Sequence, residues 1–214
     1  MAGRFVTFEG GEGAGKSTQT RLLLAALEGA GITAQGTREP GGSPNAEAVR
    51  RLLLEGDGER WDAVGEALLL MAARRDHVTR LIEPSLAQGI WVVSDRFADS
   101  TSAYQGYGKG LALADLAALH RFALGAFAPD LTLILDLPVE IGLARAAARG
   151  AATDRFEGLD PAFHERLRRG FRQIAAENTG RCVLLDASAD PQAVHRGVLD
   201  AIERRLKITL SEAS

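Results

Sequence analysis

Short apolar runs alternate with longer stretches of helical periodicity along most of the chain. The apolar runs are rich in Val, Ile and Leu and predict strands near Phe5–Glu9, Thr33–Thr37, Ile90–Ser94, Leu131–Asp136 and Arg181–Leu185. Because these runs do not alternate strictly with polar residues, they are typical of strands that are covered on both faces.

The stretches between the strands carry apolar residues at helical spacing. They predict helices near Gly15–Glu28, Pro44–Leu54, Trp61–Ala87, Leu113–Phe127, Val139–Arg149, Pro161–Asn178 and Pro191–Leu206. The repeated order of strand and helix predicts an α/β fold with a parallel sheet and right-handed crossovers. No internal repeat, low-complexity tract or Pro/Ser-rich linker interrupts it, so we expect residues 1–214 to form a single domain.

The composition excludes several classes of protein. The chain has 214 residues, of which 46% are hydrophobic and 25% charged, as in an ordinary globular protein. A net charge of −3 argues against broad binding to a nucleic-acid backbone. No apolar run approaches the ~20 residues of a membrane span, and no signal peptide opens the chain. We therefore expect a cytoplasmic protein with neither a membrane nor a nucleic acid as its partner.

The one cysteine, Cys182, excludes an internal disulfide and a metal site built from several thiolates.

A glycine-rich loop separates the first predicted strand from the first predicted helix. Its residues are Gly10, Gly11, Glu12, Gly13, Ala14, Gly15, Lys16 and Ser17, followed by Thr18. They fit the G-x-x-x-x-G-K-[ST] phosphate-binding motif in the strand–loop–helix context that this motif requires. Lys16 is expected to reach the β- and γ-phosphates of ATP, and the Ser17 hydroxyl to hold Mg²⁺. The alternative is a glycine-rich connection that only turns the chain.

Polar residues at the ends of other strands are further candidates, because ligands of open α/β sheets bind at the carboxyl ends of the strands. Asp95 resembles a carboxylate that holds Mg²⁺ through water, although it could instead cap the next turn. Arg38, Arg50 and Arg96 could bind the phosphate of a phosphoryl acceptor with planar, bidentate guanidinium groups. Arg50 stands next to Arg51, and one of that pair is expected to be solvated.

A small Gly/Ala-rich segment, about 149–157, suits a mobile lid over a charged ligand. It carries Arg149 and Arg155. A well-placed arginine stabilises the charge that spreads over a transferred phosphoryl group and is worth about 10³–10⁵ in rate. The candidate catalytic residues are therefore Lys16, Arg96, Arg149 and Arg155. Either lid arginine could instead be a solvated loop charge.

Five short segments of the chain, taken together, closely resemble the corresponding motifs of bacterial thymidylate kinases. They are Gly10–Ser17 with Glu12 inside the loop, Thr37–Gly42, Ser94–Phe97, Ser100–Gly106 and Asp154–Glu157, and they are spread over nearly the whole chain. The resemblance implies a three-layer P-loop kinase fold with a five-stranded parallel sheet, and a homodimer. It also implies transfer of the ATP γ-phosphate to dTMP, giving dTDP and ADP with the help of Mg²⁺.

The same resemblance implies a set of residues that bind dTMP. They are Glu12, Arg38, Arg50, Leu70, Arg74, Arg96, Thr101, Tyr104 and Gln105. In that pattern Glu12 contacts the sugar 3′-hydroxyl and the arginines Arg38, Arg50 and Arg96 contact the phosphate. Because residues 11–14 include no basic side chain, the lid is expected to supply the catalytic arginine, with Arg149 as the first choice.

The base is expected to lie between polar and apolar side chains. The resemblance implies that Arg74 reaches the thymine O4 edge, that Thr101 and Gln105 hydrogen-bond the base, and that Tyr104 packs where a ribose 2′-hydroxyl would intrude. Leu70 departs from the family pattern, which commonly has a phenylalanine there. A leucine supplies an apolar floor without aromatic stacking, so we expect looser base recognition.

Other interpretations of the sequence remain open. Leu68 and Leu69, on the same predicted helix, are expected to lie in its core. The nearest rival function is a kinase for another nucleoside monophosphate or for a nucleoside. A nucleotide-dependent switch protein is less favoured, because the chain lacks the Asn/Thr-Lys-x-Asp guanine signature and the Asp-x-x-Gly switch sequence.

Overall fold

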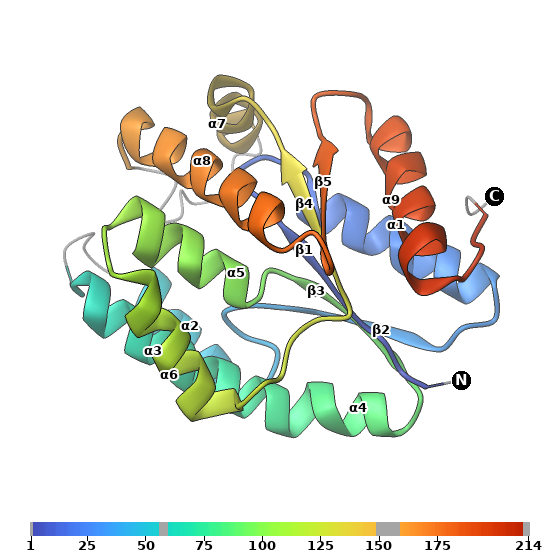
Figure 1. Cartoon of the computed structure of the whole chain (residues 1–214), viewed down its shortest axis with the longest axis horizontal. Helices are drawn as coiled ribbons and strands as arrows, with labels where there is room; N and C mark the ends of the chain where they lie inside the picture. The colour runs from blue at the N-terminus through green and yellow to red at the C-terminus, as the bar shows by residue number, and fades with distance from the viewer. Residues whose placement is uncertain (1, 56–59, 149–158, 212–214) are drawn as a thin grey trace.

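A parallel sheet forms the centre of the molecule. The computed structural model describes residues 2–55, 60–148 and 159–211. The five strands are β1 (Phe5–Glu9), β2 (Ala34–Arg38), β3 (Trp91–Asp95), β4 (Leu131–Asp136) and β5 (Cys182–Asp186), and all neighbours are parallel. Their order is β2-β3-β1-β4-β5, which places β1 in the middle (Figure 1). Each strand begins and ends within a residue of its predicted bounds, so the predicted parallel sheet is confirmed.

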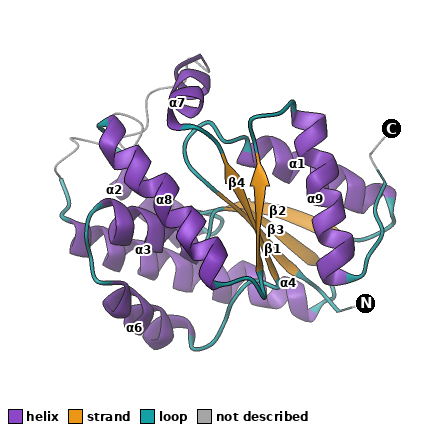
Figure 2. Ribbon diagram, turned by 45° about the horizontal axis from the view of Figure 1, so that its top comes forward, coloured by secondary structure: helices purple, strands orange, loops and turns teal. Residues whose placement is uncertain are grey.

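One face of the sheet is covered by the first and last helices. These are α1 (Lys16–Gly29) and α9 (Pro191–Leu206), which lie side by side against the strands in Figure 2. Phe8, Val93 and Leu133 point to this side and bury their side chains in one hydrophobic cluster with residues of both helices.

The opposite face is covered by helices from the middle of the chain. Val92 contributes to a cluster with residues of α3 (Ala63–His77) and α6 (Leu113–Leu124), and Ile134 to a cluster with residues of α8 (Pro161–Glu177). The central strands β3, β1 and β4 are therefore buried on both faces, as their apolar composition predicts, whereas the edge strands β2 and β5 are partly exposed. The remaining longer helices are α2 (Pro44–Leu54), which packs on α3, and α7 (Val139–Ala148), which contacts α8. None of the helices in the described part of the chain has the length and apolar character needed to cross a membrane.

The long helix predicted for Trp61–Ala87 is interrupted. It runs as α3, a π-helical turn η1 (Val78–Ile82) and a short helix α4 (Glu83–Ala87). Pro84 lies in the first turn of α4; a proline has no N–H for the α-helical ladder, and the regular ladder gives way to the wider turn just before it. Leu68 on α3 is 54% exposed, so the expectation that it belongs to the core is wrong.

The sequence did not predict the helical segment between β3 and α6. It begins as α5 (Ala98–Thr101) and continues as a π-helix η2 (Ser102–Gly108). This segment packs closely against α8: a Cβ atom added at Gly170 would lie 2.7 Å from the Tyr107 side chain. Three of the residues expected to bind dTMP lie on it, so the segment matters for the site.

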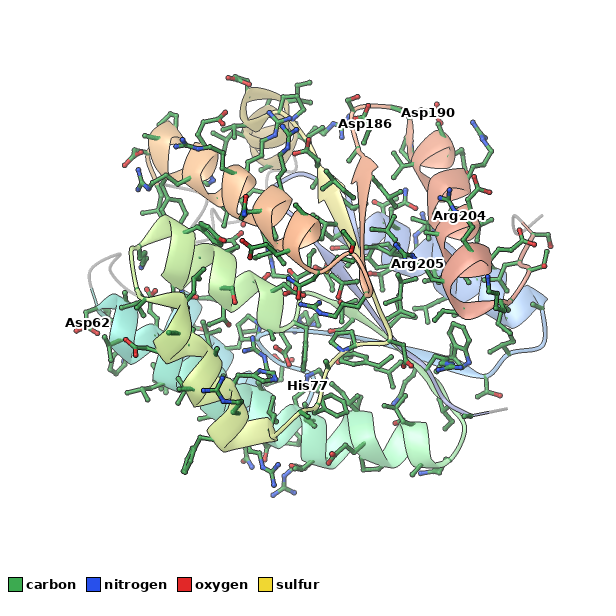
Figure 3. All side chains as sticks on the ribbon, viewed as in Figure 1. Asp62, His77, Asp186, Asp190, Arg204 and Arg205 are labelled. Carbon is green, nitrogen blue, oxygen red and sulfur yellow. The ribbon has the colours of Figure 1, made fainter. Side chains whose placement is uncertain are left out.

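Aspartates occupy the N-cap position of several helices. The Asp62 carboxylate accepts from the Gly65 N–H at 2.7 Å at the start of α3, and Asp190 accepts from two N–H groups at the start of α9 (Figure 3). α9 also has a proline in its first turn, where no N–H is needed. These local signals explain why the starts of the helices were well predicted.

Candidate active site

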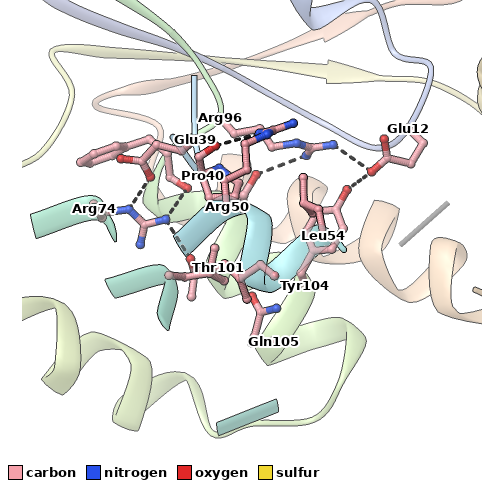
Figure 4. Close-up of a pocket in the computed structure, with 14 residues that line it drawn as sticks. Glu12, Glu39, Pro40, Arg50, Leu54, Arg74, Arg96, Thr101, Tyr104 and Gln105 are labelled. Carbon is pink, nitrogen blue, oxygen red and sulfur yellow. Dashed lines mark hydrogen bonds and ion pairs between the residues drawn. The ribbon is translucent and has the colours of Figure 1, made fainter. Parts of the chain in front are cut away.

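Two cavities open next to each other at the edge of the sheet where the strands end. The first, the loop cleft, is lined by residues 12–19, Arg38, Glu39, Arg50, Asp95, Arg96, Arg145, residues 187–191 and Val194. The second, the inner pocket, is lined by Glu12, Glu39, Pro40, Arg50, Leu53, Leu54, Leu70, Arg74, Arg96, Phe97, Ser100, Thr101, Tyr104 and Gln105 (Figure 4). Glu12, Glu39, Arg50 and Arg96 line both cavities and form a wall between them.

The glycine-rich loop has the backbone geometry of a tight phosphate-binding loop. Gly10 has φ 134° and Gly13 has φ 66°, conformations that side chains other than glycine rarely adopt. A Cβ atom at Gly13 would lie 2.1 Å from the carbonyl oxygen of Gly142 on α7, and one at Gly142 would lie 2.4 Å from that of Glu12. Loop and helix therefore touch through two glycines.

Lys16 begins α1 and folds back over the loop. Its Nζ donates to the carbonyl oxygens of Gly11 at 2.7 Å and Gly10 at 3.1 Å. Burial lowers the pKa of Lys16 to about 8, and the neighbouring charge of Arg96 acts in the same direction. An anionic ligand in the loop cleft would restore the full charge of this ammonium group.

Ser17 and Asp95 form an oxygen pair beside Lys16. Asp95 ends β3, and its Oδ2 accepts from the Ser17 hydroxyl at 2.6 Å. Hydroxyl and carboxylate oxygens are the ligands that Mg²⁺ prefers, so this donor set fits a magnesium ion. Across the described residues no group of three or more His, Cys, Asp or Glu side chains forms a metal site. A Mg²⁺ ion shared with nucleotide phosphates needs no such group.

Arg96 lies at the centre of the shared wall. It has φ 73°, a left-handed conformation that is strained for a side chain of this size and is typical of functional sites. Its guanidinium donates to Gly10 O at 3.0 Å and Glu12 Oε1 at 2.9 Å, and it lies 5.0 Å from the centre of the Tyr104 ring. Burial acts to lower the pKa of Arg96, but Tyr104 and Glu12 outweigh it and raise the pKa. Arg96 is therefore a fixed positive charge between the two cavities.

Glu12 receives two hydrogen bonds inside this wall. Arg96 and the Tyr104 hydroxyl both donate to its Oε1 (Figure 4). Burial acts to raise the pKa of Glu12, but the charges of Arg96 and Lys16 and the bond from Tyr104 bring it down to about 2. The carboxylate is ionised at neutral pH and can accept a hydrogen bond from a ligand hydroxyl.

Arg74 is buried at the far end of the inner pocket. Its guanidinium donates to Glu39 Oε2 at 2.6 Å, to Thr101 Oγ1 at 2.9 Å and to the carbonyl oxygen of Phe97 at 3.1 Å. The other carboxylate oxygen of Glu39, Oε1, lies 3.0 Å from His77 Nδ1. This network holds Arg74 in one orientation, with Thr101 next to it.

The remaining predicted dTMP-binding residues are distributed over both cavities. Leu70, Tyr104 and Gln105 line the inner pocket. Arg50 lines both cavities and donates to Pro40 O at 2.7 Å. Arg38 lines only the loop cleft, where its Nη2 lies 3.1 and 3.2 Å from the two carboxylate oxygens of Glu47.

The residues of the predicted phosphate loop gather at the loop cleft. Residues Glu12 to Thr18 line the loop cleft, while Gly10 and Gly11 support it by accepting hydrogen bonds from Lys16. Arg149, Arg155 and the predicted lid at about 149–157 lie outside the described residues.

Several polar residues that line or support the cavities were not predicted from the sequence, and two of them are Arg145 and Glu9. Arg145 of α7 lines the loop cleft and donates to the carbonyl oxygens of Ala187 at 3.1 Å and Ser188 at 3.4 Å. Its neighbours in sequence are alanines and a leucine, which carry no local signal of a site.

The second missed residue is Glu9, the last residue of β1. It is fully buried and accepts hydrogen bonds from the Phe97 N–H at 2.8 Å, the Ser100 N–H at 3.2 Å and the Ser100 hydroxyl at 2.6 Å. Burial and the charge of Asp99 raise the pKa of Glu9 to about 8, against the bond from Ser100. Glu9 thus fixes the start of α5, directly after Arg96. The sequence signal that could have identified Glu9 is a charged residue at the end of an apolar strand.

The two cavities meet end to end, one at a phosphate loop and the other lined by arginines, so a phosphate donor and an anionic acceptor can face each other across Arg96. That arrangement defines a P-loop kinase. Comparison with known proteins narrows the class. The family model described as thymidylate kinase matches residues 8–198, and the chain belongs to this family.

Individual relatives agree with the family match. A thymidylate kinase of Caulobacter vibrioides is 55% identical over 204 residues, which cover 95% of this chain and 98% of the relative. One from Rhodopseudomonas palustris is 57% identical over 209 residues, 96% of this chain and 91% of the relative. The crystal structure of thymidylate kinase from Ehrlichia chaffeensis superposes with a TM-score of 0.75 at 34% identity, covering 94% of this chain and 99% of that one.

Proposed function

We propose that this protein transfers the γ-phosphate of ATP to dTMP, giving dTDP and ADP. The observation that carries the proposal is the wall shared by the loop cleft and the inner pocket, with Arg96 at its centre. Phosphoryl transfer requires the two substrates to be held in line while charge on the transferred group is neutralised, and this wall stands where the two ends would meet.

The loop cleft is the ATP site in this proposal. Lys16 exchanges its bonds to the loop carbonyls for phosphate oxygens, and the loop N–H groups and the N-terminus of α1 add further positive potential. Ser17 and Asp95 would hold a Mg²⁺ ion, which when bound would supply positive charge to the nucleotide phosphates. Arg145 and the segment 187–189 form the wall that contacts the adenine.

The inner pocket is the dTMP site. Arg96 and Arg50, which line both cavities, bind the phosphate of dTMP, and Arg38 faces them from the loop cleft. The Glu12 carboxylate accepts from the sugar 3′-hydroxyl. The Tyr104 ring, held by its bond to Glu12, lies where a 2′-hydroxyl would intrude. Arg74, Thr101 and Gln105 bind the base above Leu70.

The catalytic arginine comes from the lid at about 149–157 of a single kinase domain. Arg149→Ala should chiefly lower kcat, because the lid arginine acts on the transferred group and not on bound dTMP. An unchanged kcat in both Arg149→Ala and Arg155→Ala would rule out this origin of the catalytic arginine.

The proposed reaction is tested with a panel of acceptors. The protein is incubated with ATP, Mg²⁺ and each nucleoside monophosphate in turn, and release of ADP is followed. We expect dTMP to be the best substrate, dUMP to follow because it differs by one methyl group, and dCMP and AMP to be poor. If dTMP is no better than dCMP or AMP, the assignment of the base is wrong.

We also propose that two copies of the chain associate through α3 and α6. Leu68 on α3 and Phe122 on α6, which is 90% exposed, border a shallow groove whose apolar side chains include Met71 and Leu124, with Arg75 and Arg121 beside them. Apolar surface of this kind, contributed by neighbouring helices, is typical of an interface between subunits. A second copy related by a two-fold axis would bury the same surface on both chains.

A further inference from the structure

We propose that Glu66, a buried carboxylate on α3, determines which base the inner pocket accepts by fixing the orientation of the Gln105 side-chain amide. The inference rests on the proposed function only in naming dTMP as the ligand of this pocket. Glu66 is fully buried and does not line either cavity, so it acts through Gln105 as a positioning residue.

The geometry around Glu66 leaves Gln105 one orientation. Glu66 Oε2 lies 3.0 Å from Gln105 Nε2, and Glu66 Oε1 accepts from Lys109 Nζ at 2.7 Å. The Lys109 ammonium compensates the buried negative charge. An ionised carboxylate can only accept hydrogen bonds, so the nitrogen end of the Gln105 amide has to face it. The carbonyl end, Oε1, is therefore held on the other side.

This orientation leaves an acceptor without a partner. Gln105 lines the inner pocket, and its buried Oε1 has no hydrogen-bond partner among the described residues. Arg74 lines the same pocket and is satisfied at Nε and Nη2, while its buried Nη1 also lacks a partner within the described part of the chain. Leaving buried polar atoms unpaired is costly, so both atoms favour a ligand that completes them.

The two unpartnered atoms, one acceptor and one donor, match one kind of pyrimidine edge. Thymine and uracil carry an N3–H donor next to the O4 acceptor. Cytosine carries an N3 acceptor next to an amino donor, which is the reverse. Gln105 Oε1 and Arg74 Nη1 therefore complement thymine and uracil and leave cytosine with two mismatched groups. If the amide of Gln105 turned over, its NH₂ group would accommodate the cytosine N3 instead.

The test replaces Glu66 by glutamine, whose amide can donate or accept, so Gln105 is free to take either orientation. Binding of dTMP, dUMP and dCMP is measured by calorimetry without ATP, and kcat/KM is measured with ATP. In Glu66→Gln we expect the preference for dTMP over dCMP to fall about tenfold, since one buried mismatch is relieved. The preference for dTMP over dUMP should stay the same, because both bases present the same edge and differ only in the methyl group.

The dUMP comparison separates positioning from general damage. A general structural defect in the pocket would change the preference for dTMP over dCMP and the preference for dTMP over dUMP together, or would change neither. Either result would overturn the proposal. If Glu66→Gln fails to fold, the double variant Glu66→Met with Lys109→Met removes the buried carboxylate and its partly exposed partner at similar volume, an exchange that proteins tolerate. It should lower the preference over dCMP in the same way.

A double-mutant cycle shows whether Glu66 acts through Gln105. In a Gln105→Ala background, Glu66→Gln should no longer change the preference for dTMP over dCMP; a change as large as in the wild type would refute the mechanism. Wild-type protein that binds dTMP but does not phosphorylate it would refute the proposed function and leave the binding test intact. Wild-type protein that binds dCMP as tightly as dTMP would overturn the role of Glu66.

Discussion

The cationic side chains of this site are each held in place by hydrogen bonds to other residues of the site. Lys16 is bonded to the carbonyl oxygens of its own loop, Arg96 to Glu12, and Arg74 to Glu39. Each cation is therefore already oriented before a substrate arrives, so less side-chain entropy is lost on binding. A substitution that removes one member of such a pair therefore also frees the side chain of the other member to move.

Lys16→Met tests the donor side at the level of one residue. The change keeps the apolar stem and removes the charge that stabilises the triphosphate, so we expect kcat to fall by about 10²–10³. Affinity for dTMP should be retained, because Lys16 does not line the inner pocket. Steady-state kinetics with calorimetry for dTMP check both; a comparable loss of dTMP binding would contradict the separation of the two sites.

Glu9 makes stability depend on pH. Its pKa is raised from 4.5 to about 8 in the folded chain, so between these values the folded state holds a proton that the unfolded state has released. The free energy of unfolding therefore falls as pH rises through this window. Glu9→Gln should remove that part of the fall, measured by urea unfolding from about pH 5 to about pH 8.

The matched control for Glu9 is Asp76→Asn. Burial acts to raise the pKa of Asp76, but hydrogen bonds from Ser43, Asn45 and Arg80 bring it down to about 2. Its stabilising contribution is therefore lost only as pH falls below about 4 and is constant in the window where Glu9 titrates. The pH slope of Asp76→Asn between about pH 5 and pH 8 should equal that of the wild type. Equal slopes for Glu9→Gln and the wild type would contradict the shifted pKa of Glu9.

The sequence predicted the residues that carry a motif and missed those that support them. Glu12, Arg96 and Tyr104 belong to recognisable segments, and the structure brings them together, with Arg96 and Tyr104 both donating to Glu12. Glu9 and Glu66 act through bonds to residues far away in the chain. Such long-range contacts leave no pattern in a local stretch of sequence, so only the fold reveals them.

At the scale of elements, the helix from Ala98 to Gly108 shows where local patterns fail. Its sequence is polar and contains glycines, so it lacks the apolar spacing that predicts a helix. Two tertiary contacts stabilise it: Glu9 accepts from the first N–H groups, and α8 packs along η2. Elements with strong local signals, such as β1 with its following loop and α9 with its Asp–Pro start, were predicted correctly.

Gly170 tests the contact between α8 and η2. A Cβ atom there would lie 2.7 Å from the Tyr107 side chain, so Gly170→Ala should lower the free energy of unfolding by about 1–3 kcal/mol, although alanine is the better helix former. Urea unfolding measures this. The matched control is Gly197→Ala on α9, where the nearest atom, of Leu185, is 3.5 Å away.

The control should change stability in the opposite direction. Gly197→Ala meets only an ordinary van der Waals contact, so helix propensity dominates and the variant should be about 0.5–1 kcal/mol more stable. If both alanine variants were stabilised to the same extent, α8 and η2 would not be in the close contact described.

At the scale of the whole molecule, the exposed apolar surface on α3 and α6 predicts self-association. The double variant Leu68→Glu with Phe122→Asp places charges in the proposed interface and should convert a dimer to a monomer in sedimentation experiments, because unpaired buried charges are costly. Leu184→Glu is the control: this leucine is 41% exposed on β5, away from both helices, and its change should leave the dimer intact.

The surface on α3 could not be separated from the core by sequence alone. Leu68, Leu69, Leu70 and Met71 are consecutive, and a helix turns each of them to a different side. Met71 is buried and Leu70 lines the inner pocket, whereas Leu68 is exposed. Which side faced the sheet depended on how α3 packs, a property of the assembled fold.

The contact between Gly13 and Gly142 limits how this enzyme can be re-engineered. Any side chain at either position collides with a main-chain carbonyl oxygen of the other element, which no compensating side-chain change elsewhere can remove. Randomised libraries should recover only glycine at both positions. A nucleotide-binding loop grafted from another scaffold would also have to bring its own partner helix in place of α7.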